Sequence, residues 1–264
     1  VLNGAATLDS CLESIFSQSY PSWEIVVMDG GSADATPAIL RSHEARIAYW
    51  ESKADRGIYH AWNKALDHAR GEWICFLGAD DRFCETDSLE RIVEALAGVG
   101  DDGRVAYARV DVVDEHGTVL ATVGRPWEET SQEFRDHMAI PHQATFHRRS
   151  LFEVHGNFDE EFRICGDYEL LLRELSDRAP HFIPEVVPVA MGAGGVSDHP
   201  SSLVRMSREF ARARYLHGLS SVPPALSFAV FRARCRASIA RVLGPRAADS
   251  VANIYRLFAG KPRL

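Results

Sequence analysis

A short apolar segment that ends in two adjacent aspartates constrains the fold more than any other feature of the chain. The segment Trp73–Leu77 is followed, after a glycine and an alanine, by Asp80 and Asp81. An apolar run this short, bounded by glycine, is typical of a strand buried on both faces of a parallel sheet. In open α/β sheets the ligand crevice lies outside the carboxyl ends of the strands. We therefore expect Asp80 and Asp81 to lie at a ligand site.

The two carboxylates indicate a bound cation. Neighbouring carboxylates repel each other, so a pair of this kind usually has a positive charge to satisfy it. Their hard oxygen atoms suit Mg²⁺ or Mn²⁺, typically shared with a phosphate. The alternative is a solvated turn whose aspartate caps the next helix. A second apolar segment, Trp23–Met28, also ends in an acidic residue, Asp29, and two such strand ends favour the metal site.

The first 100 residues alternate between segments of strand length and segments with helical spacing. Strands are expected at 23–28, 47–50 and 73–77, and helices at 8–16, 36–44 and 57–69. This alternation is typical of an α/β fold with a doubly wound, mostly parallel, Rossmann-like sheet.

The second half of the chain has weaker patterns. The turn residues 114–117 predict a β-hairpin between 105–113 and 119–123. Pro188 lies inside the apolar segment 186–191 and predicts an edge position for that strand, because proline cannot donate to a ladder.

Charge is divided unevenly along the chain, whose net charge is −8. From Arg205 to Leu264 there are twelve Lys/Arg and two Asp/Glu, a net charge of +10, so residues 1–204 carry −18. An acidic body with a basic tail indicates an anionic partner surface for the tail. No apolar run is long enough to predict a membrane-spanning helix. The five cysteines lack zinc or Cys-x-x-Cys spacing, which indicates reduced thiols in a cytosolic protein.

Several motifs, taken in order, resemble one family of enzymes. The first half contains Asn3, then DGGSADAT, DRGIYHAWNKAL and GEWICFLGADD. The second half contains PHQATFHRRSLFEVHGNFDEEF, CGDYELLLREL and MGAGGVS. This arrangement, over about residues 1–200, resembles the inverting glycosyltransferases of family two, which have the GT-A fold. It is similar to the bacterial branch that builds O-antigen and exopolysaccharide repeat units.

The resemblance implies roles for five residues on the donor side. Asn3 belongs to the donor site, Asp29 accepts a hydrogen bond from the uracil of a UDP donor, and Arg56 lies near the base or the phosphates. Asp80 meets the ribose or the sugar, and Asp81 meets the metal that bridges the diphosphate. Which of the two adjacent aspartates binds the metal directly stays open.

The resemblance also implies a catalytic base and two acceptor-side residues. Asp167 is the expected base, which takes the proton of the acceptor hydroxyl as the sugar carbon is attacked. The family usually has an acidic residue before this aspartate, and here that place is Gly166. The alternative for Asp167 is a helix N-cap. His142 and Arg148 resemble acceptor-side residues, and the alternative for His142 is a buried, hydrogen-bonded histidine.

The family begins with an apolar strand, of which only Val1-Leu2 is visible here. We therefore expect the first strand to be truncated, with the true start of the protein upstream. The expected domains are a GT-A domain at 1–204, with a nucleotide-sugar half at 1–100 and an acceptor half at 101–204, and a tail at 205–264. The tail contains apolar and Arg-rich segments around 226–243 and 251–258, which predict amphipathic helices.

These features predict a metal-dependent inverting transfer from a nucleotide sugar to a carbohydrate hydroxyl. The resemblance adds a lipid-diphosphate-linked saccharide as the acceptor. The tail then predicts a cytoplasmic enzyme held peripherally on the anionic inner face of the membrane. A structural cap is the alternative for the tail, and no nucleic-acid module is recognisable. A sugar-phosphate nucleotidyltransferase, or a catalytically silent binding module with the same fold, are the alternatives for the whole chain.

Overall fold

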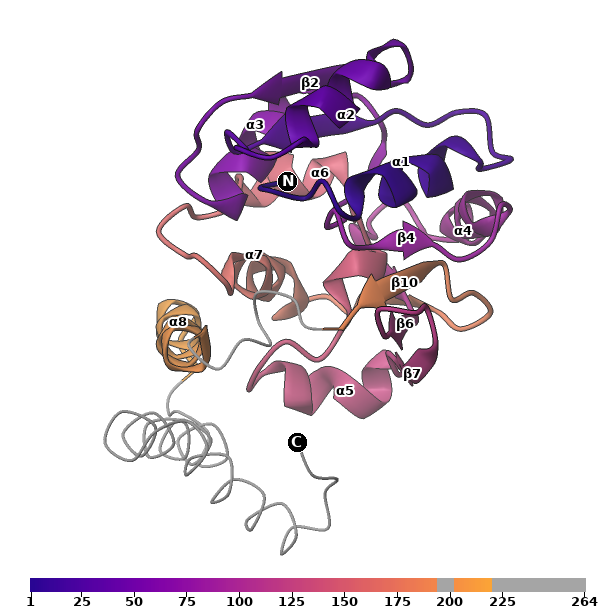
Figure 1. Ribbon diagram of the computed structural model, residues 1–264. Helices are drawn as coiled ribbons and strands as arrows, with labels where there is room; N and C mark the ends of the chain where they lie inside the picture. The colour runs from indigo at the N-terminus through magenta and orange to yellow at the C-terminus, as the bar shows by residue number, and fades with distance from the viewer. Residues whose placement is uncertain (194–201, 220–264) are drawn as a thin grey trace, which may run out of the picture. The chain divides into compact units, whose positions relative to one another are not determined.

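The N-terminal part of the chain builds a parallel pair of strands covered by helices. The computed structural model describes residues 1–193 and 202–219. Strands β1 (Val26–Asp29) and β2 (Tyr49–Ser52) pair in parallel. Around them lie α1 (Leu8–Phe16), α2 (Thr36–Ser42) and α3 (Ile58–His68), with a 3-10 turn at Glu44–Arg46 (Figure 1). Every fourth residue of α1, namely Leu8, Leu12 and Phe16, is buried, as the helical spacing predicts.

The strand before the aspartate pair belongs to a second sheet. This strand, β3 (Trp73–Cys75), begins the strand order β3-β8-β5-β9. Its companions are β8 (Thr145–Arg148), β5 (Val105–Ala108) and β9 (His181–Ile183). Both β3 and β5 run antiparallel to β8, and β9 runs parallel to β5. The carboxyl ends of β3 and β5 therefore lie at one edge of the sheet, which we call the acidic edge, and their first residues lie at the opposite edge.

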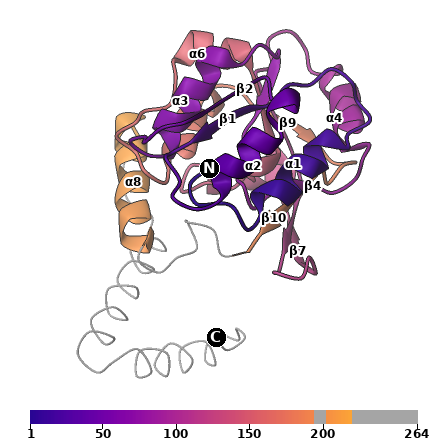
Figure 2. The same ribbon diagram turned by 45° about the horizontal axis from the view of Figure 1, so that its top comes forward.

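A third sheet has the order β4-β10-β6-β7. It consists of β4 (Arg82–Phe83), β10 (Val189–Gly192), β6 (Val110–Val113) and β7 (Val119–Val123). The expected hairpin is confirmed, since β6 pairs antiparallel with β7. All five residues of β7 are exposed, and Figure 2 shows this hairpin extending away from the rest of residues 1–193. The expected single strand 105–113 is wrong, because it breaks at Arg109 into β5 and β6, which belong to different sheets.

The edge position predicted from Pro188 is also wrong. Strand β10 lies between β4 and β6 and pairs with both. The strand begins one residue after the proline, so no ladder bond needs the missing N–H group. The Pro188 carbonyl still accepts from the Cys84 N–H at 2.9 Å. Proline is tolerated at the entrance of an interior strand for this reason.

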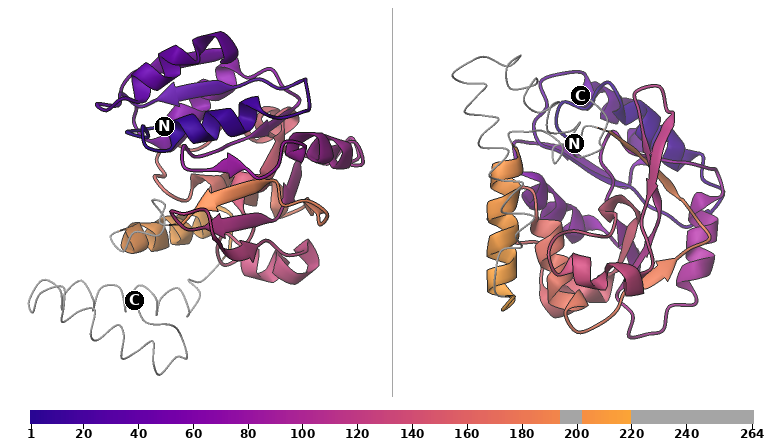
Figure 3. Two further views of the ribbon diagram at one scale, coloured as in Figure 1. Left: turned by 45° about the vertical axis from the view of Figure 1, so that its right-hand side comes forward. Right: turned by 90° about the horizontal axis from the view of Figure 1, so that it is seen from below.

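The expected α/β class is confirmed, but the described sheets are more mixed than a doubly wound parallel sheet. Three of the described strand pairs are parallel and four are antiparallel. The main cause is β8, which runs antiparallel between β3 and β5. The remaining helices of the first unit are α4 (Ser88–Leu96), α5 (Trp127–Phe134), α6 (Arg149–His155) and α7 (Gly166–Leu175), with a 3-10 turn at His142–Ala144 (Figure 3).

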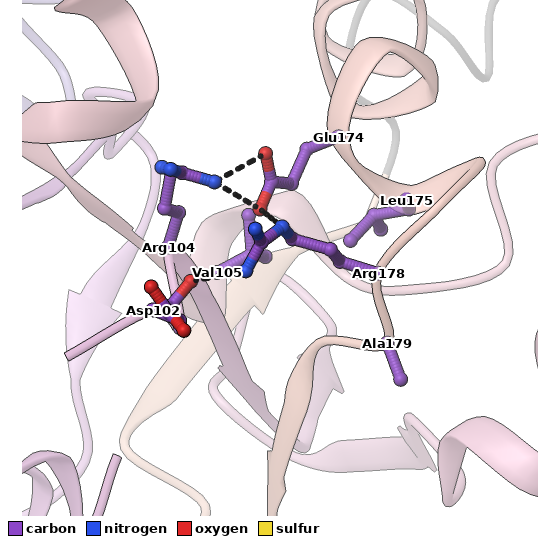
Figure 4. Close-up of a pocket in the computed structure, with 8 residues that line it drawn as sticks. Asp102, Arg104, Val105, Glu174, Leu175, Arg178 and Ala179 are labelled. Atoms are coloured by element: carbon purple, nitrogen blue, oxygen red, sulfur yellow. Dashed lines mark hydrogen bonds and ion pairs between the residues drawn. The ribbon is translucent and has the colours of Figure 1, made fainter. Parts of the chain in front are cut away.

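Helix α7 is almost wholly buried and is anchored at its C-terminal end. There the Glu174 carboxylate, 3% exposed, accepts from Arg104 Nη1 at 3.2 Å (Figure 4). It also lies 2.6 Å from His155 Nε2. A cavity of about 270 Å³ lies beside this ion pair, lined by Asp102–Val105 at the start of β5. A ten-residue helix is about 15 Å long. Its other end, with Asp167, therefore lies well away from this cavity, at the side where β3 and β5 end.

The chain divides into two compact units, Val1–Ala193 and Gly194–Leu264, where the sequence predicts a division after residue 204. In the second unit the described part is α8 (Ser202–Leu216) and the three residues after it. The amphipathic helices expected at 226–243 and 251–258 lie outside the described residues. Among the helices in 1–193 and 202–219, none has the length and apolar character needed to cross a membrane.

Candidate active site

The aspartate pair lies on a tight loop after β3, with Gly78 beneath it. The Gly78 N–H donates to Asp81 Oδ2 at 2.7 Å, and the Asp81 N–H donates to the Gly78 carbonyl at 3.2 Å. A Cβ atom added to Gly78 would lie 2.6 Å from Asp80 Oδ1 and 3.0 Å from Asp81 Oδ2. Glycine is therefore needed here so that both carboxylates can occupy the space above the loop. Asp81 is 3% exposed, whereas Asp80 is exposed.

The two carboxylates fit a divalent cation that is shared with a ligand. Burial raises the pKa of Asp81 to about 7, and the charge of Asp80 adds to this increase, while the Gly78 N–H opposes it. A nearby cation would remove this cost of ionisation. Within residues 1–193 and 202–219, no three histidine, cysteine or acidic side chains are grouped so that they could hold a metal ion. Asp80 and Asp81 would therefore supply one or two ligands, with phosphate and water oxygens completing the shell, as is usual for Mg²⁺.

Asp29, at the end of β1, is fully buried and its carboxylate is well satisfied. Ser32 Oγ donates to Oδ1 and Ser52 Oγ donates to Oδ2, both at 2.5 Å. The Ser32 N–H lies 3.2 Å from both oxygens. These bonds join the end of β1 and the loop after it to the last residue of β2. Asp29 thus holds the walls of the candidate nucleotide site together and has little accepting capacity left for a base.

The first residues of the chain connect this nucleotide loop to the aspartate pair. Asn3 Oδ1 accepts from the Ala33 N–H at 2.9 Å, and the Asn3 N–H donates to Ser32 Oγ at 2.6 Å. A Cβ atom added to Gly4 would lie 3.0 Å from the Ala79 Cβ. The turn at Asn3 and Gly4 therefore lies against both loops. The structure thus brings together three expected donor residues, Asn3, Asp29 and Asp80, with Asp81.

One carboxylate at this site was missed by the sequence analysis. Asp55 lies directly over Gly30, since a Cβ atom on that glycine would be 2.6 Å from Asp55 Oδ2. The Gly57 N–H donates to Asp55 Oδ1 at 2.8 Å. Asp55 is only partly buried, so its Oδ2 can reach a ligand more easily than the oxygens of Asp29. Its position next to Arg56, in the turn that leads into α3, is the sequence signal that could have identified it.

Arg56 lies at the same turn and faces the segment before α7. Its Nη2 is 2.5 Å from Glu160 Oε2, and the side chain is 66% exposed. Two residues of α3 hold that segment in place. Asn63 Nδ2 donates to the Phe158 carbonyl at 2.9 Å, and the Tyr59 hydroxyl lies 3.1 Å from Asp167 Oδ1. Asp167 is therefore packed beside the start of α3, on the same side as the nucleotide loop.

The position of Asp167 bears on the N-cap alternative. The N-cap residue of α7 is Cys165, with no side-chain cap bond, and Asp167 lies within the first helical turn. A carboxylate there interacts favourably with the positive end of the helix. Asp167 is therefore not the N-cap residue of α7.

The two expected acceptor-side residues lie at different edges of the second sheet. His142 precedes β8 and so lies at the acidic edge, but it is 7% exposed and stacks on Trp62 with ring centroids 5.0 Å apart. Burial lowers its pKa to about 3, so the ring is neutral. Nε2 of His142 and Nε2 of the neighbouring His147 have no hydrogen-bond partner among the described residues. His142 is therefore buried, as the alternative predicts, but its Nε2 lacks the hydrogen bond that the alternative also predicts.

Arg148 is not brought to the acidic edge. It pairs with Trp73 at the first residue of β3, the end opposite the aspartate pair. Its Nη1 donates to the carbonyls of Gly100 and Asp101 at 2.9 and 2.8 Å, and its guanidinium lies 4.7 Å from the Trp73 ring centroid. These contacts give Arg148 a structural role in closing the far edge of the sheet, and we no longer assign it to the acceptor site.

Known proteins match this arrangement in sequence. The family model described as Glycosyl transferase family 2 matches residues 1–154. A PGL/p-HBAD biosynthesis glycosyltransferase of Mycobacterium tuberculosis is 31% identical over 204 residues, which cover 75% of this chain and 76% of the relative. An uncharacterized glycosyltransferase of the same species is 34% identical over 168 residues, or 63% of each chain.

Solved structures show the same fold at low sequence identity. Residues 1–349 of TarS from S. aureus, in complex with UDP-GlcNAc, superpose with a TM-score of 0.62 at 17% identity; the match covers 81% of this chain and 64% of that one. The mannosyltransferase PcManGT from Pyrobaculum calidifontis, in complex with GDP-Man and Mn²⁺, has a TM-score of 0.61 at 19% identity, with 99% and 74% covered. With the fold, the acidic loop and these matches in agreement, the chain belongs to glycosyl transferase family 2 and has the GT-A fold.

Proposed function

We propose that this glycosyltransferase moves a sugar from a UDP-sugar to a carbohydrate hydroxyl with inversion at the sugar carbon. The observation that carries the proposal is the carboxylate pair over Gly78, which lies beside the nucleotide loop through the turn at Asn3 and Gly4. In this reaction the acceptor oxygen forms a bond to C1 of the sugar as the bond from C1 to the diphosphate oxygen breaks. The bonding electrons leave with the nucleoside diphosphate.

A divalent cation fits the acidic loop, and Asp80 and Asp81 would hold it. When bound, such a cation supplies Lewis-acid stabilisation of the charge that builds up on the leaving diphosphate. The protein's own contribution is to keep the two carboxylates close together over a glycine, in spite of their repulsion. PcManGT, in the structure that superposes on this chain, is in complex with Mn²⁺, which supports Mn²⁺ as the first ion to test.

For base recognition we assign the carboxylate of Asp55 in place of Asp29. Both lie at the ends of β1 and β2, but Asp29 already accepts hydrogen bonds from Ser32 and Ser52. Asp55 Oδ2 lies over Gly30 and can accept the N–H group of a uracil ring. We assign Arg56, which is exposed and next in sequence, to the phosphates, for which it would exchange its ion pair with Glu160. TarS, which superposes on this chain, is in complex with UDP-GlcNAc and supports a uridine donor.

We assign Asp167 as the general base. It would take the proton of the acceptor hydroxyl while that oxygen attacks C1 from the face opposite the diphosphate. Gly166 replaces the acidic residue that usually precedes it in the family, so a single carboxylate serves this role.

Binding of the donor is expected to require metal. Calorimetry with UDP should show binding with Mn²⁺ and little or none in EDTA, because the diphosphate would otherwise face the Asp80 and Asp81 carboxylates. Incubation with a panel of nucleotide sugars should then identify one that is hydrolysed or transferred only with metal. Tight UDP binding in EDTA would contradict the metal assignment, and binding of GDP in preference to UDP would contradict the donor class.

The acceptor and the membrane form the second part of the proposal. The +10 segment 205–264 on a −18 body supports attachment to an anionic inner leaflet, where a lipid-diphosphate-linked saccharide would be presented. Each Lys/Arg near such a surface contributes about 1 kcal/mol. Even half of the basic residues would therefore give useful binding.

Flotation with vesicles tests this attachment. The chain should float with anionic vesicles at low salt and less well at about 1 M salt, where the Debye length falls to about 3 Å. It should float weakly with neutral vesicles, and a chain ending at Ser221 should remain at the bottom under all conditions. If the shortened chain floats as well as the full one, residues 222–264 do not bind the membrane.

A further inference from the structure

The hydroxyl of Tyr59 lies between two oxygen acceptors beside the proposed base. It is 2.6 Å from the Ile164 carbonyl and 3.1 Å from Asp167 Oδ1. A tyrosine hydroxyl carries one hydrogen and also accepts hydrogen bonds. It can therefore donate to only one of these oxygens at full strength at any moment. When Asp167 is protonated, the hydroxyl oxygen of Tyr59 can instead accept a hydrogen bond from it.

The Tyr59 ring is held firmly enough to keep the hydroxyl in this place. The residue is 3% exposed. One face stacks on Phe158, with centroids 5.5 Å apart and planes 26° apart, and Trp62 meets the ring edge at 5.4 Å. Gly166 lies against the ring, and a Cβ atom there would be 2.7, 2.8 and 2.9 Å from three ring carbons. This explains why the position before Asp167 has no side chain in this protein.

We propose that Tyr59 is a positioning residue for Asp167, whose carboxylate its hydroxyl contacts. The Tyr59 ring occupies the space that any side chain at position 166 would need. The proposal rests on the assignment of Asp167 as the base. It deepens that assignment by naming the group that orients the carboxylate and responds to its change of charge.

Rotation of the Tyr59 hydroxyl can accompany the proton transfer. Before the transfer, Asp167 is a carboxylate, and the hydroxyl hydrogen is shared between its Oδ1 and the nearer Ile164 carbonyl. As the acceptor oxygen bonds to C1 and the diphosphate leaves, the acceptor proton moves to Asp167. The hydroxyl hydrogen can then turn to the Ile164 carbonyl, so that its oxygen accepts from the new carboxylic acid. Burial, and after it the charge of Asp167, raises the pKa of Tyr59 well above its usual value, against the smaller opposing effect of the Asp167 and Gly166 backbone, so the hydroxyl remains protonated throughout.

Tyr59→Phe tests this role because it removes the hydroxyl and keeps the ring. The assay uses Mn²⁺ and the nucleotide sugar that the panel identifies as the donor. In it, kcat should fall roughly tenfold, which corresponds to the free energy of one hydrogen bond to a charged group, while the KM for the donor should not change. The acid limb of the kcat/KM profile should move to higher pH by about 0.5–1 unit, since a hydrogen bond to the carboxylate favours its charged form. Gly166→Ala, which displaces the ring, should lower kcat in the same way.

Tyr107→Phe is the matched control. Tyr107 is also buried, and its hydroxyl donates to a backbone carbonyl, that of Arg125 at 2.7 Å. This variant should keep the wild-type kcat and pH profile. If the Tyr59 hydroxyl had a purely structural role, Tyr59→Phe would lower the melting temperature and leave the pH profile of kcat/KM unchanged. That result would overturn the proposal.

Asp167→Asn separates this proposal from the proposed function. In that background Tyr59→Phe should have no further effect on kcat, because the group it acts through is absent. An equal loss from Tyr59→Phe in both backgrounds would show that Tyr59 acts elsewhere. If Asp167→Asn itself were fully active, the assignment of the base would fail. If Asp167→Asn were inactive and Tyr59→Phe normal, only the role of Tyr59 would fail.

Discussion

Asp167→Asn is expected to lower kcat by roughly 10²–10⁴-fold, the usual contribution of a general base. The amide has nearly the same size and can accept from the Tyr59 hydroxyl 3.1 Å away, so the first turn of α7 should remain intact. It cannot take a proton from the acceptor. Because Asp167 has no assigned contact with the nucleotide, the affinity for UDP in Mn²⁺ should change by less than about twofold.

Asp177→Asn provides the matched control for this experiment. Asp177 is exposed and lies just beyond the other end of α7, so the same substitution there should leave kcat, UDP affinity and melting temperature unchanged. Single-turnover rates should be measured with enzyme in excess over the donor and at saturating concentration, so that the chemical step is separated from product release. A parallel loss of UDP affinity and rate in Asp167→Asn would show that the residue supports the donor site and is not the base.

The donor side of this site could be predicted from the sequence because its signals are local. An apolar strand, a glycine and two aspartates are close together in the chain. Strands β3 and β5 run in the same direction, so β3 places its last residues at the acidic edge although the antiparallel β8 lies between them. Asp29 was found by the same rule. Its hydrogen bonds to Ser32 and Ser52 could not be predicted, since Ser52 comes from another strand whose register is not visible in the sequence.

The acceptor side depends on long-range pairing, and there the predictions were weaker. Arg148 and His142 lie six residues apart in one motif, which suggested a shared role. The antiparallel register of β8 with β3 puts Arg148 beside Trp73. His142 precedes β8 and Arg148 ends it, so the length of β8 separates the two residues. The break of 105–113 at Arg109 has a related cause, since each half of this segment pairs with a different partner strand.

Gly166 shows how a departure from a family pattern can acquire a physical reason only in three dimensions. In the sequence it is a missing acidic residue. In the structure it lies against the ring of Tyr59, whose hydroxyl reaches the neighbouring Asp167 across a sequence separation of 108 residues. No local pattern links α3 to the first turn of α7, so this contact could not be inferred from spacing.

Asp81→Asn is expected to abolish metal-dependent UDP binding without weakening the fold. The asparagine side chain would keep an oxygen that accepts from the Gly78 N–H, as Asp81 Oδ2 does at 2.7 Å. It would lose the charge that attracts a divalent cation. The matched control is Asp101→Asn, an exposed residue at the opposite edge of the sheet, which should bind UDP and Mn²⁺ as the wild type does.

The stability of this variant in EDTA should depend on pH in a direction set by the pKa of Asp81. Burial raises that pKa from 3.8 to about 7 in the folded protein. A raised folded-state pKa gives a stabilising contribution that is fully present below pH 3.8 and is lost as pH rises to about 7. Without metal, ionised Asp81 therefore costs roughly 1–4 kcal/mol of folding free energy above pH 7, and asparagine removes this cost.

The melting temperature of Asp81→Asn should exceed that of the wild type by more at pH 8 than at pH 5. Mn²⁺ should reverse the order at pH 8, because it stabilises the wild type alone. A variant that is less stable than the wild type in EDTA at pH 8 would show that the carboxylate is needed for the loop itself, and the metal assignment would then lose its physical basis.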